Sequence, residues 1–446
     1  TFKHSVFGSK MQQLEDRKGK TMSGTTKMHY AWWIFIGCCF VNAASMAASI
    51  SIVGVYLLPV SKSIGVGPGD WMLWMTICSV VSCIATSFWG QAIQTKSINI
   101  VTTLSAVLLA LAVFMFSFGN SVQWFYVWGG VLGLAMPCIA TLTVPTLLGN
   151  WFGKKQRGKV LGIAAAFTGV GTFCWAPLFT MILQNLGWQT AYQINAALII
   201  VCLVPWTLFV FKFKPEDKGL EPYGFDAKLA AEEADAMKQG VSRSKALKTA
   251  PFWIMVFVIL FTSIGMGFNS NQVAIATEAV GGIMGMESAA MLGASMISVA
   301  AVGNILGKIV FGFMQGKAGL KATFVTFVAA FFIGFALWAF VPASAALLIG
   351  AFLFGSHNAL ISVGYPLVVR NLYGNKDYSK IFSNLMTVNG LMGGISGTII
   401  SFVYQTLGSY HAALIAAMVL IVIIGILIVA ACSFIGKIKW DEVSKA

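Results

Sequence analysis

Charged residues are scarce in this chain. Of its 446 residues only 10% are charged, 58% are hydrophobic, and the mean hydropathy is +0.81. A soluble domain carries about 25% charged residues, so water is not the main solvent of this protein. The few charges are also unbalanced, because the chain has 29 Lys and Arg residues but only 15 Asp and Glu residues.

Groups that could perform chemistry are equally rare. The eight cysteines all lie within apolar stretches and show no paired spacing in polar loops, so we expect neither disulfides nor a zinc site. The apolar stretches contain no paired carboxylates, no histidine cluster and no nucleophile beside a base. We therefore predict no enzyme, no metal and no cofactor. The first 29 residues are polar and lack the apolar core of a cleavable signal.

Long apolar runs fill most of the remaining sequence. A helix needs ~20 apolar residues to cross ~30 Å of hydrocarbon, because in lipid it must satisfy its backbone polar groups internally. Twelve runs meet this requirement and predict an all-α membrane protein; they span residues 30–58, 71–90, 98–118, 122–149, 160–183, 191–211, 252–279, 289–315, 322–340, 344–369, 382–406 and 412–435.

The distribution of Lys and Arg predicts the orientation. With the N-terminus in the cytoplasm, every Lys and Arg except Lys62 belongs to an inner segment or an inner helix end, as the positive-inside rule requires. We therefore expect a multi-pass protein of the cell (inner) membrane with both termini in the cytoplasm. The net charge of +14 then reflects topology and attraction to anionic membrane lipid, and we expect no binding of nucleic acid.

An internal repeat divides the chain. At an offset of 221 residues, segment 145–159 matches segment 366–380, and Gln184 and Gly187 match Gln405 and Gly408. Two parallel six-helix bundles, related by a pseudo-two-fold axis along the membrane normal, are therefore predicted. The expected parts are a cytoplasmic N-terminal segment (1–29), a first bundle (30–211), a cytoplasmic linker with a short surface helix at 226–239 (212–250), a second bundle (251–436) and a tail (437–446).

These features resemble the major facilitator superfamily. That family has Gly-rich basic loops after the second and eighth spans, and here segments 90–96 and 312–321 occupy those places, without the acid and the Arg that are usual there. Two further segments, 244–253 and 304–312, resemble the oxalate:formate antiporter and monocarboxylate porter branch. The resemblance implies a secondary active or facilitative transporter that works by alternating access, carrying a small organic anion together with, or in exchange for, a proton or a counter-substrate. We expect it to be a monomer.

Lys308 is the principal candidate for binding the anion. A charged side chain within a span costs ~2.5–3.5 kcal/mol, so it is a functional candidate. Asn304 precedes it by one helical turn on the same face. The resemblance assigns Lys308 the role of pairing the substrate carboxylate, because relatives in that branch carry an Arg there. Those relatives hold a second carboxylate with a Lys in the eleventh span. In this chain the corresponding residues, 383–393, contain no cation, so a monocarboxylate is favoured. Alternatively, Lys308 extends to the lipid headgroups.

Other polar residues within the spans are candidates for lining a solute path. His357 could carry a coupling proton, or it could be a neutral histidine bonded to a neighbouring helix. The remaining candidates for substrate binding are Asn42, Asn269, Gln272, Asn389, Trp175 and Tyr365. Small polar residues also hold membrane helices together, which is the alternative for this set.

A second function is compatible with the same fold. A proton-coupled exporter of amphipathic or drug-like compounds would have the same twelve spans and the same repeat. The spans lack the mid-membrane Asp or Glu that usually carries the proton in this superfamily. That lack favours exchange or facilitated diffusion over tight proton symport.

Overall fold

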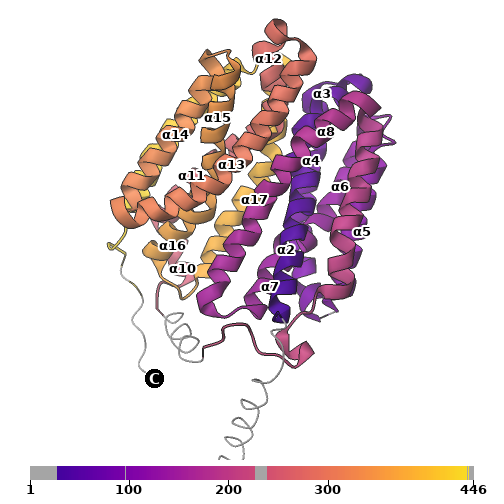
Figure 1. Ribbon diagram of the computed structural model, residues 1–446. Helices are drawn as coiled ribbons and strands as arrows, with labels where there is room; N and C mark the ends of the chain where they lie inside the picture. Colours follow the sequence, from indigo (N-terminus) through magenta and orange to yellow (C-terminus); the bar gives the residue numbers. More distant parts are fainter. Residues whose placement is uncertain (1–27, 96, 227–238, 439, 441–446) are drawn as a thin grey trace, which may run out of the picture.

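The computed structural model describes residues 28–95, 97–226, 239–438 and 440, and within them the protein is helical without a named strand. The predicted surface helix at 226–239 and most of the predicted N-terminal segment lie outside the described residues. Figure 1 shows two bundles side by side, one indigo to magenta and the other orange to yellow.

Eleven helices in the described part are long and apolar enough to cross a membrane. The longest, Lys154–Val210, has 57 residues. Its regular portion α8, Lys154–Pro205, has 52 residues, or ~78 Å at 1.5 Å per residue, more than twice the thickness of the hydrocarbon. At Gly187 the backbone has φ 81° and ψ 165°, which is not helical, and the chain turns back there. Residues 154–210 therefore cross twice, and the twelve predicted spans are confirmed.

The spans follow one another in chain order. Those of the first half are α2 (Tyr30–Met46) with η1 (Ala47–Ser51) and α3 (Val53–Ser63), α4 (Pro68–Thr95), α5 (Ile98–Phe116), α6 (Val122–Met136) with η2 (Pro137–Leu142) and α7 (Thr143–Trp151), and the two parts of α8, ending in η3 (Trp206–Val210). Those of the second half are α11 (Ala250–Met266) with η5 (Gly267–Asn271) and α12 (Gln272–Met284), α13 (Met286–Ala318), α14 (Leu320–Phe340), α15 (Ser344–Ser356) with η6 (Leu360–Gly364) and α16 (Tyr365–Tyr373), α17 (Tyr378–Leu407) and α18 (His411–Ser433). Two short turns of helix, η4 (Pro215–Lys218) and α10 (Arg243–Ala246), belong to the linker.

Most helices extend beyond the predicted apolar runs. The first crossing continues to Ser63 rather than ending at 58, and α4 covers Pro68–Thr95 rather than 71–90. Hydropathy marks the part of a helix that lies in hydrocarbon. Polar residues at the ends keep the helical backbone as it enters the interface.

The repeat extends to the irregularities of the helices. The first span changes from α to π geometry at Ala47–Ser51, and the seventh changes to a 3₁₀ turn at Gly267–Asn271, an offset of 220 residues. The fourth and tenth spans contain π segments at Pro137–Leu142 and Leu360–Gly364. Such interruptions leave backbone groups outside the regular ladder and often mark functional positions. The two bundles are therefore similar in their deviations as well as in their helices.

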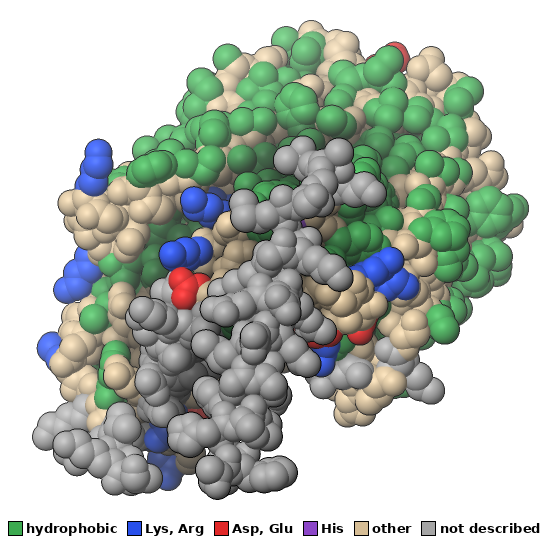
Figure 2. All heavy atoms as spheres, turned by 60° about the horizontal axis from the view of Figure 1, so that its bottom comes forward, with side chains coloured by type: hydrophobic (Ala, Val, Ile, Leu, Met, Phe, Trp, Pro, Cys, Tyr) green, Lys and Arg blue, Asp and Glu red, His purple; other side chains and the backbone are tan. Residues whose placement is uncertain are grey.

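Charge separates the two ends of the molecule. We call the end that carries the linker the linker end, and the opposite end, with the turns at Gly65, Gly187, Gly285 and Gly408, the far end. Figure 2 looks toward the linker end, where Lys and Arg side chains are visible around the face. Among the described Lys and Arg residues, only Lys62 and Lys308 belong elsewhere.

The linker is attached to both halves at matching points of the repeat. In the first half, Tyr223 donates its N–H to the carbonyl of Trp151 (2.9 Å) and accepts from Gly153 (2.9 Å). In the second half, Val241 donates to the carbonyl of Tyr373 (2.8 Å). Gly240 lies directly against Gly374, the repeat partner of Gly153. The matching glycines of segments 145–159 and 366–380 thus allow the linker backbone to approach closely.

The linker also forms a charged contact with the start of α17. The carboxylate of Asp377 accepts the backbone N–H of Arg243 (2.9 Å) and pairs with Lys380 (3.0 Å). The N–H of Arg243, followed by Lys380, lowers the pKa of Asp377 below its ordinary value. This contact is therefore present above the ordinary aspartate pKa and is lost only as the pH falls through the lowered value.

Close helix packing depends on glycine at several crossings, including that of α13 with α15. An added Cβ at Gly307 would lie 2.8 Å from the Cα of Ser356, whereas at Gly312 on the same helix it would meet no atom within 4 Å. Small residues let membrane helices approach closely, and this approach supplies much of the packing energy in lipid.

Gly307→Ala is therefore expected to destabilise the protein by ~1–3 kcal/mol, because α13 and α15 must move apart to accommodate the methyl group. The purified variant should melt at a lower temperature than the parent protein. Gly312→Ala is the matched control and should be neutral or slightly stabilising, since alanine favours the helix and nothing obstructs it. Equal melting temperatures for the two variants would contradict the packing role.

Candidate functional site

A cavity of about 230 Å³ lies between the two halves. Every lining residue is uncharged or an imidazole, and hydroxyl and amide groups alternate with Met, Ile, Ala and Phe. The first half contributes Met46, Ile50, Ser51, Met75, Thr168, Gly169 and Thr172; the second contributes Met266, Asn269, Ser270, Ile297, Ala300, Ala301, Asn304, Phe354, Gly355, His357, Asn358 and Gly393.

The cavity lies where the helices depart from regular geometry. Ser51 belongs to η1 and Asn269 to η5, while His357 and Asn358 immediately precede η6. Irregular backbone at membrane depth is tolerated where it is buried in protein or lines a cavity. The internal symmetry of the chain thus brings irregular segments from both halves to one place.

His357 has the most constrained side chain in the cavity. It is 1% exposed, and its ring stacks on Phe331 with centroids 4.5 Å apart and an interplanar angle of 12°. Its Nδ1 is hydrogen-bonded to the backbone carbonyl of Phe354. Its Nε2 is buried and has no hydrogen-bond partner in the part of the chain that the structure covers.

Two predicted amides also line the cavity. The Oδ1 of Asn304 is buried and finds no partner among the described residues. The Oδ1 of Asn269 accepts from the Nε2 of Gln272 at 3.1 Å. Gln272 is fully buried behind Asn269 and does not itself line the cavity, and its own Oε1 lacks a partner in the described chain.

Lys308 lies beyond the lining residues but on their face of α13. At 100° per residue, Ile297, Ala301, Asn304 and Lys308 fall within about 60° of one another. The lipid-exposed residues Leu306, Ile309 and Phe313, which are 43%, 50% and 70% exposed, lie on the opposite face of the helix. Lys308 is half-buried, and within the described ranges it forms no salt bridge.

Four other predicted residues lie in contacts between helices and do not line the cavity. Each has a polar atom bonded to a neighbouring span: Asn42 donates to the carbonyl of Ala164 (2.7 Å), Trp175 to the carbonyl of Ala43 (2.7 Å), Asn389 accepts from Ser263 (2.9 Å), and the Tyr365 hydroxyl pairs with Thr262 (2.6 Å). Such bonds satisfy polar groups that lipid cannot solvate.

Sequence reasoning missed several short polar residues of the lining, including Ser51, Thr168 and Thr172. The repeat offers a signal for Thr168 alone, because at the offset of 221 it matches the predicted Asn389, although Asn389 itself does not line the cavity. Thr172 matches Gly393, whose place in the lining is visible only in the structure. Hydroxyl residues are common in membrane helices, so each of them attracts little attention when it is considered alone.

The halves are tied together at the far end by a pair of glutamines that match in the repeat. Gln405 of α17 donates to the carboxylate of Asp70 on α4 (2.8 Å) and accepts the N–H of Gly69 (3.0 Å). Gln184 of α8 donates to the carbonyl of Glu287 on α13 (3.3 Å). Toward the linker end, by contrast, an added Cβ at Gly390 of α17 or Gly162 of α8 would meet no atom within 4 Å.

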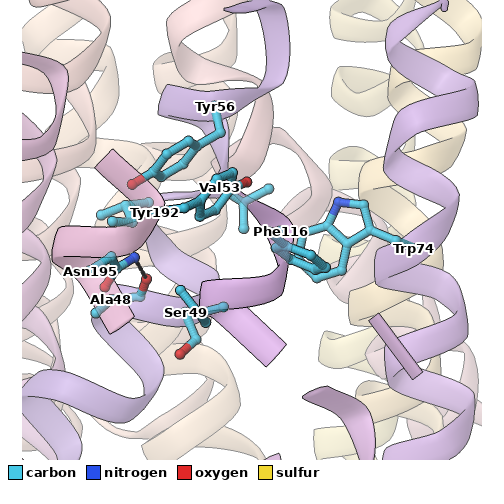
Figure 3. Close-up of a pocket in the computed structure, with 10 residues that line it drawn as sticks. Ala48, Ser49, Val53, Tyr56, Trp74, Phe116, Tyr192 and Asn195 are labelled. Atoms are coloured by element: carbon cyan, nitrogen blue, oxygen red, sulfur yellow. Dashed lines mark hydrogen bonds between the residues drawn. The ribbon is translucent and has the colours of Figure 1, made fainter. Parts of the chain in front are cut away.

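A second cavity, within the first bundle, is too small for a solute. Figure 3 shows the stacked rings of Tyr56 and Tyr192, 4.0 Å apart, and Asn195, which donates to the carbonyl of Ala48 at 2.8 Å. Its volume is about 10 Å³, the space of a single water molecule. The cavity between the halves is therefore the candidate site.

The family follows from the comparison with known proteins. The model of the Major Facilitator Superfamily matches residues 38–309, more than half of the chain. The chain belongs to this family. Its predicted assignment and its predicted fold are thus confirmed.

Similar proteins within the family differ in the solutes that their names give. Monocarboxylate transporter 12 of Xenopus laevis is 21% identical over 404 residues, which cover 86% of this chain and 85% of the relative. The purine ribonucleoside efflux pump NepI of Escherichia coli O1:K1 / APEC is 25% identical over 147 residues, 33% of this chain and 37% of the pump. Among solved structures, a mutant of the nucleoside transporter NupG aligns with a TM-score of 0.71 and 13% identity, covering 90% of this chain and 100% of that chain. A bacterial homologue of the lysosomal transporter Spinster, in an inward-facing conformation, aligns with a TM-score of 0.68 and 14% identity, covering 93% and 99%.

Gln405→Ala is expected to loosen the far end, because it removes the side chain that holds both Gly69 and Asp70. Loss of a hydrogen bond to a charged acceptor costs ~1.5–3 kcal/mol, so the amides of residues 64–72 should exchange with deuterium about tenfold faster or more. Thr406→Ala is the control, because the Thr406 hydroxyl bonds only to carbonyls of its own helix. Unchanged exchange in Gln405→Ala would show that the contact does not hold the halves together.

Proposed function

We propose that the protein transports a small organic anion, a monocarboxylate, by alternating access, with the cavity between the halves as the binding site. The observation that carries this proposal is the position of Lys308, a cation on the cavity face of α13 without a salt bridge to any described residue. Its Cα lies one turn, or ~6 Å, from that of Asn304, which lines the cavity.

The energetics favour an anionic partner. A half-buried ammonium without a salt bridge is costly within a membrane, and a bound carboxylate would offset part of that cost. The described lining of the cavity adds no further cation to Lys308, which lies beyond it. A solute with one negative charge is therefore better matched than one with two.

The arrangement of the halves supports alternating access. Side-chain hydrogen bonds join the halves at the far end, and residues of both halves line the cavity between them. We take the linker end as cytoplasmic because it carries nearly all of the described Lys and Arg residues. Rocking of the two bundles would break the glutamine contacts and open the cavity at the far end.

A relative supports the solute class. The protein named Monocarboxylate transporter 12 is similar over most of the chain. The same class is suggested by the segments 244–253 and 304–312, which resemble the monocarboxylate porter branch.

A second candidate is a neutral, hydrogen-bonding solute such as a nucleoside. The observation in its favour is that the described residues in direct contact with the cavity are amides, hydroxyls and one imidazole, without a formal charge among them. Similarity to a purine ribonucleoside efflux pump over about a third of the chain adds to it. For such a solute, Lys308 would be dispensable.

Lys308→Ala is expected to lower counterflow of monocarboxylates by at least tenfold, because the carboxylate loses its charge partner. The measurement uses proteoliposomes and a panel of radiolabelled C2–C6 monocarboxylates, with adenosine as the competing candidate. Lys308→Arg keeps the charge and should retain most of the activity. The amount of inserted protein and its melting temperature provide the folding control. Full activity in Lys308→Ala, or transport of adenosine alone, would overturn the proposal.

The sequence leaves two roles open for His357, a carrier of a coupling proton or a neutral, hydrogen-bonded imidazole, and a measurement of proton flux separates them. If transport is proton-coupled through His357, substrate-driven acidification of the liposome lumen should be lost in His357→Gln while counterflow persists. A pH-sensitive dye enclosed in the liposomes measures this. If acidification survives the substitution, another group carries the proton; if acidification is absent from the parent protein, exchange or facilitated diffusion is favoured.

A further inference from the structure

The ring of His357 is held in one orientation. Phe331 stacks on it, and Phe354 packs against it at a tilt, with centroids 4.9 Å apart. Its Nδ1 is engaged by the carbonyl of Phe354 on the preceding turn. A ring flip would place a carbon where that bond is made, so the ring keeps Nδ1 at that carbonyl and Nε2 on its opposite side.

The bonding of Nδ1 fixes the role of Nε2. A backbone carbonyl can only accept, so the proton of a neutral imidazole must lie on Nδ1. The other nitrogen then offers a lone pair and no hydrogen. His357 is therefore a fixed acceptor on a residue that lines the cavity.

The surroundings favour the neutral ring. Two aromatic side chains cover its faces, and no Asp or Glu belongs to the described lining of the cavity, so nothing there would balance an imidazolium. The helix α13 packs against α15, and Lys308 is the one described charge on its cavity side. Lys308 would repel a second positive charge. Protonation would also remove the acceptor.

We infer that the transported solute must itself donate a hydrogen bond, from a hydroxyl or an amino group, to Nε2 of His357. This inference rests on the proposed function and makes it more specific. A buried acceptor without a partner is costly, and a bound solute is the group that can relieve that cost. His357 is thus a specificity-determining residue.

The donor and the carboxylate must occupy different ends of the solute. A carboxylate has only acceptors, so it would repel the lone pair of Nε2, and its place is at Lys308. Asn304 lines the cavity one helical turn from Lys308, and its amide offers both a donor and an acceptor. The cavity therefore distinguishes a carboxylate that bears a hydroxyl or amino group from the same carboxylate without one.

The test compares solutes that differ only in the donor. Each solute competes with a radiolabelled monocarboxylate for counterflow in proteoliposomes. The series contains butanoate, its 2-, 3- and 4-hydroxy derivatives, the methyl ether of each hydroxy acid, and 4-aminobutanoate. We expect at least one hydroxy or amino acid to compete tenfold or more better than butanoate. Its methyl ether should lose that advantage, because the ether oxygen can only accept.

A substitution then locates the effect. In His357→Phe, which keeps an aromatic ring between Phe331 and Phe354 but cannot accept, the advantage of the donor over butanoate, measured as a ratio within the variant, should fall to less than twofold. His357→Gln, whose side-chain amide can accept, should restore part of it. The melting temperatures of both variants report folding.

The outcomes separate this inference from the proposed function. If butanoate and all of its derivatives compete equally, water satisfies Nε2 and the inference is wrong, although transport of monocarboxylates stands. If the donor advantage survives in His357→Phe, another residue provides it and the inference is equally wrong. If no carboxylate in the series competes at all, the proposed function fails first.

Discussion

The hydrocarbon of a bilayer cannot form hydrogen bonds, and the rest of this structure depends on that constraint. The backbone meets it by forming twelve helical crossings, and most polar side chains meet it by bonding to a neighbouring helix, as Asn42 does to Ala164. Polar atoms that remain without a partner are then informative. Nε2 of His357 and Oδ1 of Asn304 both belong to residues that line the cavity between the halves.

The internal repeat organises both ends of the molecule as well as its middle. The irregular turns at Ala47–Ser51 and Gly267–Asn271 shape the cavity, and Gln184 and Gln405 join the halves at the far end. At the linker end, the repeat provides two equivalent docking points for one connecting segment. A similar arrangement in each half is what two bundles need if they move as units about a central site.

The architecture could be predicted from the sequence because hydropathy and the repeat are properties of long segments. The site could be predicted only in part. His357, Asn269 and Asn304 line the cavity, whereas Asn389 and Tyr365 bond to neighbouring helices. Sequence shows that a polar residue lies within a span, but its role depends on which helix faces it and in what rotation. The face of Lys308 likewise became clear only when its exposed neighbours on α13 identified the lipid side.

The two docking points of the linker have a mechanical consequence. The chain is fixed to the first half at Tyr223 and to the second half at Gln239, whose carbonyl accepts from Asn375 (2.8 Å). The intervening sixteen peptide steps could reach at most ~50–60 Å when fully extended. This reach is an upper bound on the separation of the two docking points, and it allows the bundles to rock while the linker stays bonded to both.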